Sequence, residues 1–139
     1  MAEKRHSASA ANAGRSVLLT DLYELTMLQA YFDEGLNGTA AFELFMRTLP
    51  AGRNFLMAAG LEQVLDYLAT LRFTAADLAW LRKSKRFTPE FLASLEGLRF
   101  TGDVDAMSEG TIFFPDEPIL RITAPLREAQ LVESRVMNL

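Results

Sequence analysis

The segment Thr20–Tyr31, TDLYELTMLQAY, reads as a helix whose apolar residues are not confined to one face. Its apolar residues form one stripe at helical spacing and a second group on much of the other side: Leu22, Leu25, Leu28 and Phe32, then Tyr23, Met27, Ala30 and Tyr31. An amphipathic surface helix leaves a polar face for water, and this segment leaves little of one. The pattern therefore predicts a helix that is buried on both sides, or one whose second side is covered by a partner.

Local signals predict where this first helix begins and ends. Asp21 is expected to cap it, with Glu24 three residues later as the capping-box partner. Gly35 and Gly38 follow the apolar stretch, as helix stop signals do.

Two segments with strand character come next. Thr39–Leu49 places successive side chains on opposite faces, which favours a strand. Pro50–Asn54 is expected to form a turn, and the short apolar run Phe55–Ala59 is a candidate for another strand.

Three short helices are predicted after Gly60. The first carries apolar residues at helical spacing over 61–71. Thr74, with Asp77 three residues on, starts the second. Thr88 and Pro89 start the third, because proline suits the first helical position.

Two charged groupings lie in the middle and later part of the chain. The run RKSKR, 82–86, can bind phosphate, but a solvated loop is the favoured interpretation. Asp103 and Asp105 share one face of the alternating segment Arg99–Met107, which is a further predicted strand. Two carboxylates on one face can hold a hard cation, but without a third ligand surface acids are the favoured interpretation.

The C-terminal segments predict a strand pair and a last helix. Ile112–Phe114 and Ile119–Thr123 are expected to pair across the turn PDEP, and Pro125 is expected to open the helix LREAQLVESRVMNL. The apolar residues of that helix spread around its circumference, and it stops on Met-Asn-Leu without a glycine cap. We expect the chain to be cut inside a larger fold that covers this apolar surface; a tight oligomer is the alternative cover.

Composition narrows the classes of protein. The chain has 139 residues, half of them hydrophobic, which suits one α+β domain with a sizeable core. A formal net charge of -4 argues against a general nucleic-acid binder. Cysteine is absent and the single histidine, His6, is in the N-terminal tail, so thiolate and histidine metal clusters are excluded. No apolar run approaches the roughly 20 residues that span a bilayer.

Residues 1–16 are predicted to form a disordered basic tail, with a transit peptide as the less favoured interpretation. Residues 17–124 are expected to form an α+β domain, and 125–139 to begin a helix that leads out of it. No Ser-His-Asp set, P-loop or dinucleotide-binding glycine fingerprint is present.

Three long segments carry a family resemblance. LLTDLYELTMLQAYFDEG resembles the opening of nicotinate phosphoribosyltransferases. AAFELFMRTLPAGRNFLMAAGLEQVLDYL resembles the strand, turn and helix that follow in that family, and LRFTGDVDAMSEGTIFFPDEPILRITAPLREAQLVES resembles the segment that closes its N-terminal domain. The resemblance covers about Leu18–Leu139 and implies the N-terminal α+β domain of a type II phosphoribosyltransferase.

The resemblance also implies a reaction. Such enzymes join nicotinate to phosphoribosyl pyrophosphate, with ATP hydrolysis and Mg²⁺, to give nicotinate mononucleotide in cytoplasmic NAD biosynthesis. Their catalytic histidine lies in an irregular α/β barrel that follows this region, and this sequence has no counterpart. The chain is therefore expected to be a fragment that has no catalytic residue, binds no cofactor by itself and is inactive alone, with no nucleic-acid or membrane partner.

The resemblance implies substrate-binding residues as well. The family's sites form between the two subunits of a homodimer, and the first-helix motif reaches the neighbouring barrel. Carried over, Tyr23 stacks on the pyridine ring and Asp21 lines the same pocket; the alternatives are core packing for Tyr23 and a helix cap for Asp21. Arg47, at the end of FELFMR, is implied to meet substrate phosphates, with a surface arginine as the alternative.

Two other classes of function stay open for the sequence. One is a noncatalytic regulatory or scaffold domain, and the other is a pyridine-binding module that acts alone. The residues that separate nicotinate, nicotinamide and quinolinate enzymes lie largely in the barrel, although the TDLYELTM form favours nicotinate.

Overall fold

The computed structural model describes residues 16–139. The predictions made for the tail and for His6 lie outside the described residues, apart from Ser16. The chain folds into helices and two small antiparallel sheets, which confirms the predicted α+β class.

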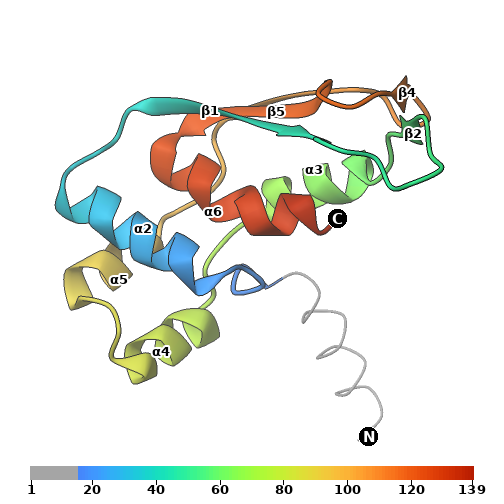
Figure 1. Ribbon diagram of the computed structural model, residues 1–139. Helices are drawn as coiled ribbons and strands as arrows, with labels where there is room; N and C mark the ends of the chain where they lie inside the picture. The colour runs from blue at the N-terminus through green and yellow to red at the C-terminus, as the bar shows by residue number, and fades with distance from the viewer. Residues whose placement is uncertain (1–15) are drawn as a thin grey trace, which may run out of the picture.

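A three-stranded antiparallel sheet has β5 (Pro118–Pro125) between β1 (Thr39–Phe45) and β3 (Asp103–Ala106). The central strand alternates, and its residues Leu120, Ile122 and Ala124 are buried on the core face. Figure 1 shows α3 (Leu61–Thr70) and α6 (Leu126–Met137) beneath this sheet. The helix α6 follows β5 directly, so the polypeptide turns back under the sheet that it has just completed.

The remaining helices group at the other end of the molecule: α2 (Leu22–Asp33), α4 (Ala75–Ser84) and α5 (Pro89–Leu95) (Figure 1). The predicted capping box of Thr74 and Asp77 is present, and the Thr88 hydroxyl accepts a hydrogen bond from the backbone N–H of Phe91. Local capping chemistry therefore predicts two of the helix starts correctly.

The predicted hairpin across Pro115–Pro118 is wrong. The short strand β4 (Ile112–Phe113) pairs with β2 (Leu56–Met57), whereas β5 pairs with β1 and β3. The backbone N–H of Asp116 donates to the carbonyl of Met46 at 2.9 Å, so this segment is held by the end of β1 and not by a hairpin turn. The two strands separate there, and each finds its partner far away in sequence.

The strand predicted over Arg99–Met107 is shorter than expected, because β3 covers only Asp103–Ala106. Immediately before it, Gly102 lies against the backbone of β5. A Cβ atom at Gly102 would approach the Cβ of Ala124 to 2.4 Å, so only glycine fits this crossing without a shift of the backbone.

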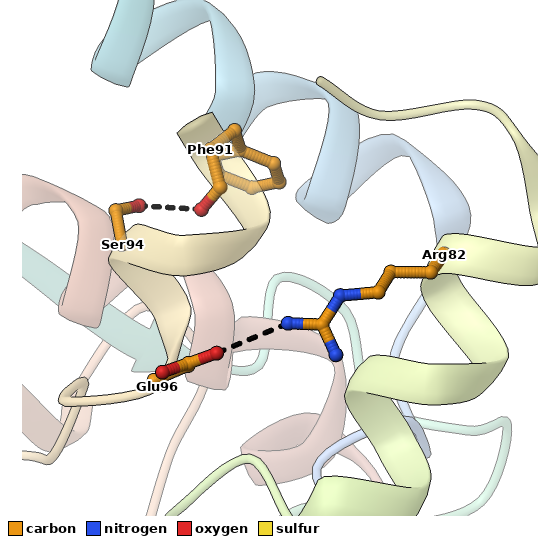
Figure 2. Close-up of polar contacts among 4 residues, drawn as sticks. All are labelled: Arg82, Phe91, Ser94 and Glu96. Atoms are coloured by element: carbon orange, nitrogen blue, oxygen red, sulfur yellow. Dashed lines mark hydrogen bonds and ion pairs between the residues drawn. The ribbon is translucent and has the colours of Figure 1, made fainter. Parts of the chain in front are cut away.

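The basic run 82–86 is only partly a loop, since α4 continues through Ser84 and Lys85 adopts the left-handed conformation at φ 56°. Figure 2 shows the Arg82 guanidinium pointing at the Glu96 carboxylate, which follows α5; the closest nitrogen and oxygen are 3.0 Å apart. In the same view the Ser94 hydroxyl donates to the Phe91 carbonyl at 2.6 Å. The basic run thus contributes one exposed ion pair between α4 and the end of α5.

One apolar core joins all the larger elements. Its most enclosed side chains come from α2, α4, α5 and α6: Leu28, Leu81, Phe91, Leu95, Leu131 and Val132. On α2, Leu25 and Leu28 are buried as the stripe predicts, but Leu22 is 48% exposed. Leu22 therefore presents apolar surface outward at the start of α2, whereas Leu25 and Leu28 enter the core.

Candidate functional site

The first turn of α2 lies against α6, and Glu24 is at the centre of this contact. Glu24 is fully buried. Its carboxylate accepts hydrogen bonds from the backbone N–H of Ser134 at 2.7 Å and from the Ser134 hydroxyl at 2.6 Å. The Thr20 hydroxyl donates to its other oxygen. Donors from two segments thus satisfy a carboxylate that would be costly to bury without partners.

Asp21 is the N-cap residue of α2, but the capping box predicted for Asp21 and Glu24 is wrong. No side-chain hydrogen bond caps the helix. The Asp21 carboxylate accepts instead from the Ser134 hydroxyl at 2.8 Å, and the Glu24 carboxylate turns inward to the same residue. Tertiary donors on α6 have replaced the local cap.

Tyr23 stands at the surface between these two acids. It is 44% exposed, and its hydroxyl donates to Oε1 of Glu133 on α6 at 3.1 Å. Gln130 donates to the other oxygen of Glu133 at 2.8 Å, which fixes that carboxylate. Partial burial raises the pKa of Tyr23 above its usual value; the hydrogen bond with Ser134 opposes this shift, and the adjacent Glu133 adds to it.

Tyr67 of α3 lies near the same cluster, since the charges of Glu24 and Arg135 both act on its hydroxyl. Its side chain is 6% exposed, and its hydroxyl has no hydrogen-bond partner within residues 16–139. Burial, and then the charge of Glu24, raise the pKa of Tyr67, while the charge of Arg135 opposes that shift. The contact between α2, α3 and α6 is therefore a buried polar cluster within an otherwise apolar core.

Arg47 lies at a groove between the end of β1 and α6. The groove has a volume of about 680 Å³. Its lining is mostly apolar: Phe42, Leu44, Phe45, Met46, Leu120, Ile122, Ala129, Val132, Val136 and Met137, with the polar residues Glu43, Arg47, Thr48 and Glu133. Glu43 is bound by Arg121 across the sheet at 2.9 Å. The Arg47 side chain is exposed and has no hydrogen bond or ion pair within the part of the chain that the structure describes.

The structure brings Asp21 and Tyr23 together, because they bind the consecutive α6 residues Ser134 and Glu133. No hydrogen bond or ion pair joins Arg47 to either of them within residues 16–139, although the groove that Arg47 lines also includes Glu133, which holds Tyr23.

Sequence reasoning missed Ser134 and Glu133, and it assigned Glu24 only to a cap. One signal was present, because Thr20, Glu24 and Leu28 are spaced four residues apart and share one helix face. The partners on α6 could not be found this way, since they lie about a hundred positions further along the chain.

The described residues 16–139 contain no group of three or more acidic, cysteine or histidine side chains that could hold a metal ion. Asp103 and Asp105 are exposed on β3, an edge strand of the sheet. A separate finding is that none of its helices has the length and apolar character needed to cross a bilayer.

Comparison with known proteins gives consistent matches. Residues 18–139 match the family model of the nicotinate phosphoribosyltransferase (NAPRTase) N-terminal domain. A nicotinate phosphoribosyltransferase of Mycobacterium tuberculosis, pncB2, is 54% identical over 121 residues, which are 87% of this chain and 26% of that protein. The Bacillus subtilis nicotinate phosphoribosyltransferase is 42% identical over 123 residues, which are 88% of this chain and 25% of that protein.

Solved structures agree with these matches. The human nicotinic acid phosphoribosyltransferase superposes with a TM-score of 0.77 at 35% identity, over 86% of this chain and 25% of that one. A nicotinate-nucleotide pyrophosphorylase from Pyrococcus furiosus shares the fold, with a TM-score of 0.66 at 19% identity, over 91% of this chain and 25% of that one. The chain spans about a quarter of the length of the curated relatives that it matches.

Proposed function

The chain belongs to the nicotinate phosphoribosyltransferase family, and we propose that it acts as the N-terminal domain of an enzyme of that activity. The reaction joins nicotinate to the ribose of phosphoribosyl pyrophosphate and is coupled to the hydrolysis of ATP. Mg²⁺ is the ion that accompanies the nucleotide. The products are nicotinate mononucleotide and pyrophosphate, and the pathway is cytoplasmic NAD biosynthesis. The observation that carries this proposal is the match of residues 18–139 to the family's N-terminal domain.

In this proposal the first turn of α2 contributes one half of a pyridine site that two subunits share. Tyr23 supports this role because its ring is exposed while its hydroxyl is bound to Glu133, which limits how the ring can turn. An aromatic face held in this way is a platform for a flat heterocycle. Leu19 and Leu22 are 45% and 48% exposed beside it, which leaves apolar surface for a second subunit.

Asp21 and Arg47 have complementary parts in the proposed site. Asp21 supplies a carboxylate at the start of α2, where Ser134 holds it. Arg47 supplies an exposed guanidinium at the end of β1, and this group can grip phosphate oxygens through two parallel hydrogen bonds. The groove that Arg47 lines also includes Glu133, the residue that holds Tyr23, and this shared lining supports assigning both residues to one site.

The chain by itself is proposed to be inactive. Its only histidine is His6, so it contains no counterpart of a histidine in a following barrel. Nicotinate mononucleotide formation by a purified 139-residue chain, verified by its intact mass, would contradict this part of the proposal.

The decisive experiment uses the full-length enzyme that carries this domain. Tyr23→Ala removes the platform and should raise the KM for nicotinate by about tenfold or more, the loss expected for one stacking aromatic. Tyr23→Phe is the matched control, because it keeps the ring and loses only the hydrogen bonds of the hydroxyl to Glu133 and Glu24. Equal activity of wild type and Tyr23→Ala would reject the proposed site.

A mixed-dimer experiment tests whether two subunits share the site. A Tyr23→Ala subunit is combined with a subunit that is inactivated in its barrel. If the site is shared, the mixed dimer contains one intact site and recovers activity that neither parent has. No recovery in verified mixed dimers would place Tyr23 outside the partner's site.

A pyridine-binding or regulatory domain that acts without a barrel is the second candidate. It is favoured by one observation, namely that the exposed ring of Tyr23 is positioned entirely by residues of this chain. Saturable nicotinate binding by the 139-residue chain, abolished by Tyr23→Ala, would support this candidate. The lack of such binding, together with an active full-length enzyme, would leave the first proposal alone.

A further inference from the structure

Glu24 is the one fully buried carboxylate that the structure describes, and neither the cap assigned to it nor the proposed site accounts for its burial. Its neighbours in sequence are Tyr23 and, three residues earlier, Asp21, which are the two residues proposed to meet the pyridine ring. Its donors come from Thr20, before α2, and from Ser134, in α6. The carboxylate thus ties the start of α2 to α6 at the point from which Tyr23 and Asp21 project.

The hydrogen bonds around Ser134 distinguish the two carboxylates, Glu24 and Asp21. A serine hydroxyl has one proton to donate, yet its oxygen lies 2.6 Å from Glu24 and 2.8 Å from Asp21. The hydroxyl can therefore serve only one of the two carboxylates at a time. Glu24 keeps the Ser134 backbone N–H at 2.7 Å in either case, so Asp21 is the acid that gains or loses its partner.

The location of the two acids explains how they can lie so close. Both are at the N-terminal end of α2, where the helix dipole favours negative charge. Charge-assisted hydrogen bonds to carboxylates are about twice as strong as neutral ones. The hydrogen bonds of the buried Glu24 carboxylate can therefore hold the start of α2 more rigidly than apolar packing, because apolar contacts are not directional.

From this geometry we infer that Glu24 and Ser134 are positioning residues for the proposed substrate site. Glu24 fixes the first turn of α2 against α6, and the Ser134 hydroxyl sets the orientation of Asp21. This inference rests on the proposed function, since it concerns the placing of Tyr23 and Asp21 for the pyridine substrate.

The test measures steady-state kinetics of the full-length enzyme. Ser134→Ala deletes the shared hydroxyl and retains the backbone donor to Glu24. We expect the KM for nicotinate to rise about tenfold, since one hydrogen bond to a charged group is lost, while the KM for phosphoribosyl pyrophosphate stays within twofold. Glu24→Gln, which keeps the shape of the side chain and weakens its bonds, should change the same constant in the same direction.

Three further variants separate positioning from a general loss of structure. Thr70→Ala is the matched control, because it deletes a helix hydroxyl that bonds only to carbonyls of its own helix, at 2.7 Å to Asp66. Ser134→Thr retains the hydroxyl and should restore the KM for nicotinate. In the double variant Tyr23→Ala/Ser134→Ala the two increases in the KM for nicotinate should not add, because both residues act on the placing of the same pyridine ring.

The outcomes distinguish this inference from the proposal beneath it. If Tyr23→Ala raises the KM for nicotinate but Ser134→Ala and Glu24→Gln lower only the melting temperature, the residues are structural and the inference fails alone. If Tyr23→Ala has no effect, the proposed site and the inference fail together. A selective rise in the KM for nicotinate in Ser134→Ala, absent in Thr70→Ala, supports both.

Discussion

The two sides of α6 are built in different ways. Towards α2 the helix presents Ser134, Gln130 and Glu133, whose hydrogen bonds reach Glu24, Asp21, Tyr31 and Tyr23. Towards β1 it presents Val132, Val136 and Met137, and there an apolar groove of about 680 Å³ is open. The first side fixes particular atoms at particular distances, whereas the second offers area without direction. The side of α6 that faces α2 therefore positions side chains, whereas the side that faces β1 supplies apolar contact area.

The largest expected effect comes from the core beneath both sides. Leu131 is fully buried on α6. Leu131→Ala should lower the free energy of unfolding by about 3 kcal/mol, within the range for deletion of a buried leucine side chain. Met137→Ala is the control, since Met137 is 55% exposed in the groove and should change stability by less than about 0.5 kcal/mol. Chemical denaturation of the 139-residue chain measures both values.

That pair of variants can break the comparison. If Met137→Ala costs as much as Leu131→Ala, the groove is closed in solution by a second copy or another segment of chain. A dependence of the Met137→Ala effect on protein concentration would identify a second copy as the cover.

The polar side should give the next largest effect. Glu24→Ala removes the acceptor of the buried Ser134 backbone N–H and of the half-buried Thr20 hydroxyl, and we expect a loss of about 2 kcal/mol. Glu24→Gln should cost less, because its amide oxygen still accepts from the Ser134 backbone. A cost for Glu24→Gln equal to that for Glu24→Ala would show that charge, and not hydrogen-bond geometry, holds the two helices together.

The difference between the two sides also explains what the sequence can predict. The caps at Thr74 and Thr88 and the helix start after Pro125 depend on residues within four positions, and all three are confirmed. Strand pairing depends on distant segments, and the expected hairpin across 115–118 is wrong for that reason. An antiparallel partner cannot be chosen from alternation alone, because alternation shows which face is apolar and not which strand lies beside it.

The candidate site divides in the same way. Tyr23, Asp21 and Arg47 follow from the family resemblance, and without it core packing would be the favoured interpretation of Tyr23. Glu24 and Ser134 are 110 positions apart, so no local rule connects them. A buried glutamate on a helix with few polar positions becomes informative only when its partners are known.

Tyr67 of α3 tests whether the polar groups between α2 and α6 are fully hydrogen-bonded. Its buried hydroxyl lacks a hydrogen-bond partner within residues 16–139. Tyr67→Phe should therefore raise the free energy of unfolding by about 1 kcal/mol at pH 7, since an unsatisfied buried polar group is removed. Stabilisation would show that the polar cluster is not fully satisfied, whereas a loss of stability would indicate a bound water that uses the hydroxyl.

The same residue predicts a dependence on pH. Burial and the charge of Glu24 raise the pKa of Tyr67 in the folded chain above its value in the unfolded chain. The protonated phenol therefore contributes stability that is complete below about pH 10 and is lost as the pH rises towards the folded pKa. Wild-type stability should fall more steeply above about pH 10 than that of Tyr67→Phe. Parallel curves would contradict this sign.

The smallest expected effect concerns Glu133, which lies at the border between the two sides of α6. Glu133→Gln removes a charge that raises the pKa of Tyr23, so the pKa of Tyr23 should fall towards its ordinary value while the fold is retained. NMR titration of the Tyr23 ring measures the change, and Glu117→Gln, whose carboxylate bonds to the backbone of Phe114, serves as a remote control. A Tyr23 titration unmoved by Glu133→Gln would mean that the ring is not held by α6.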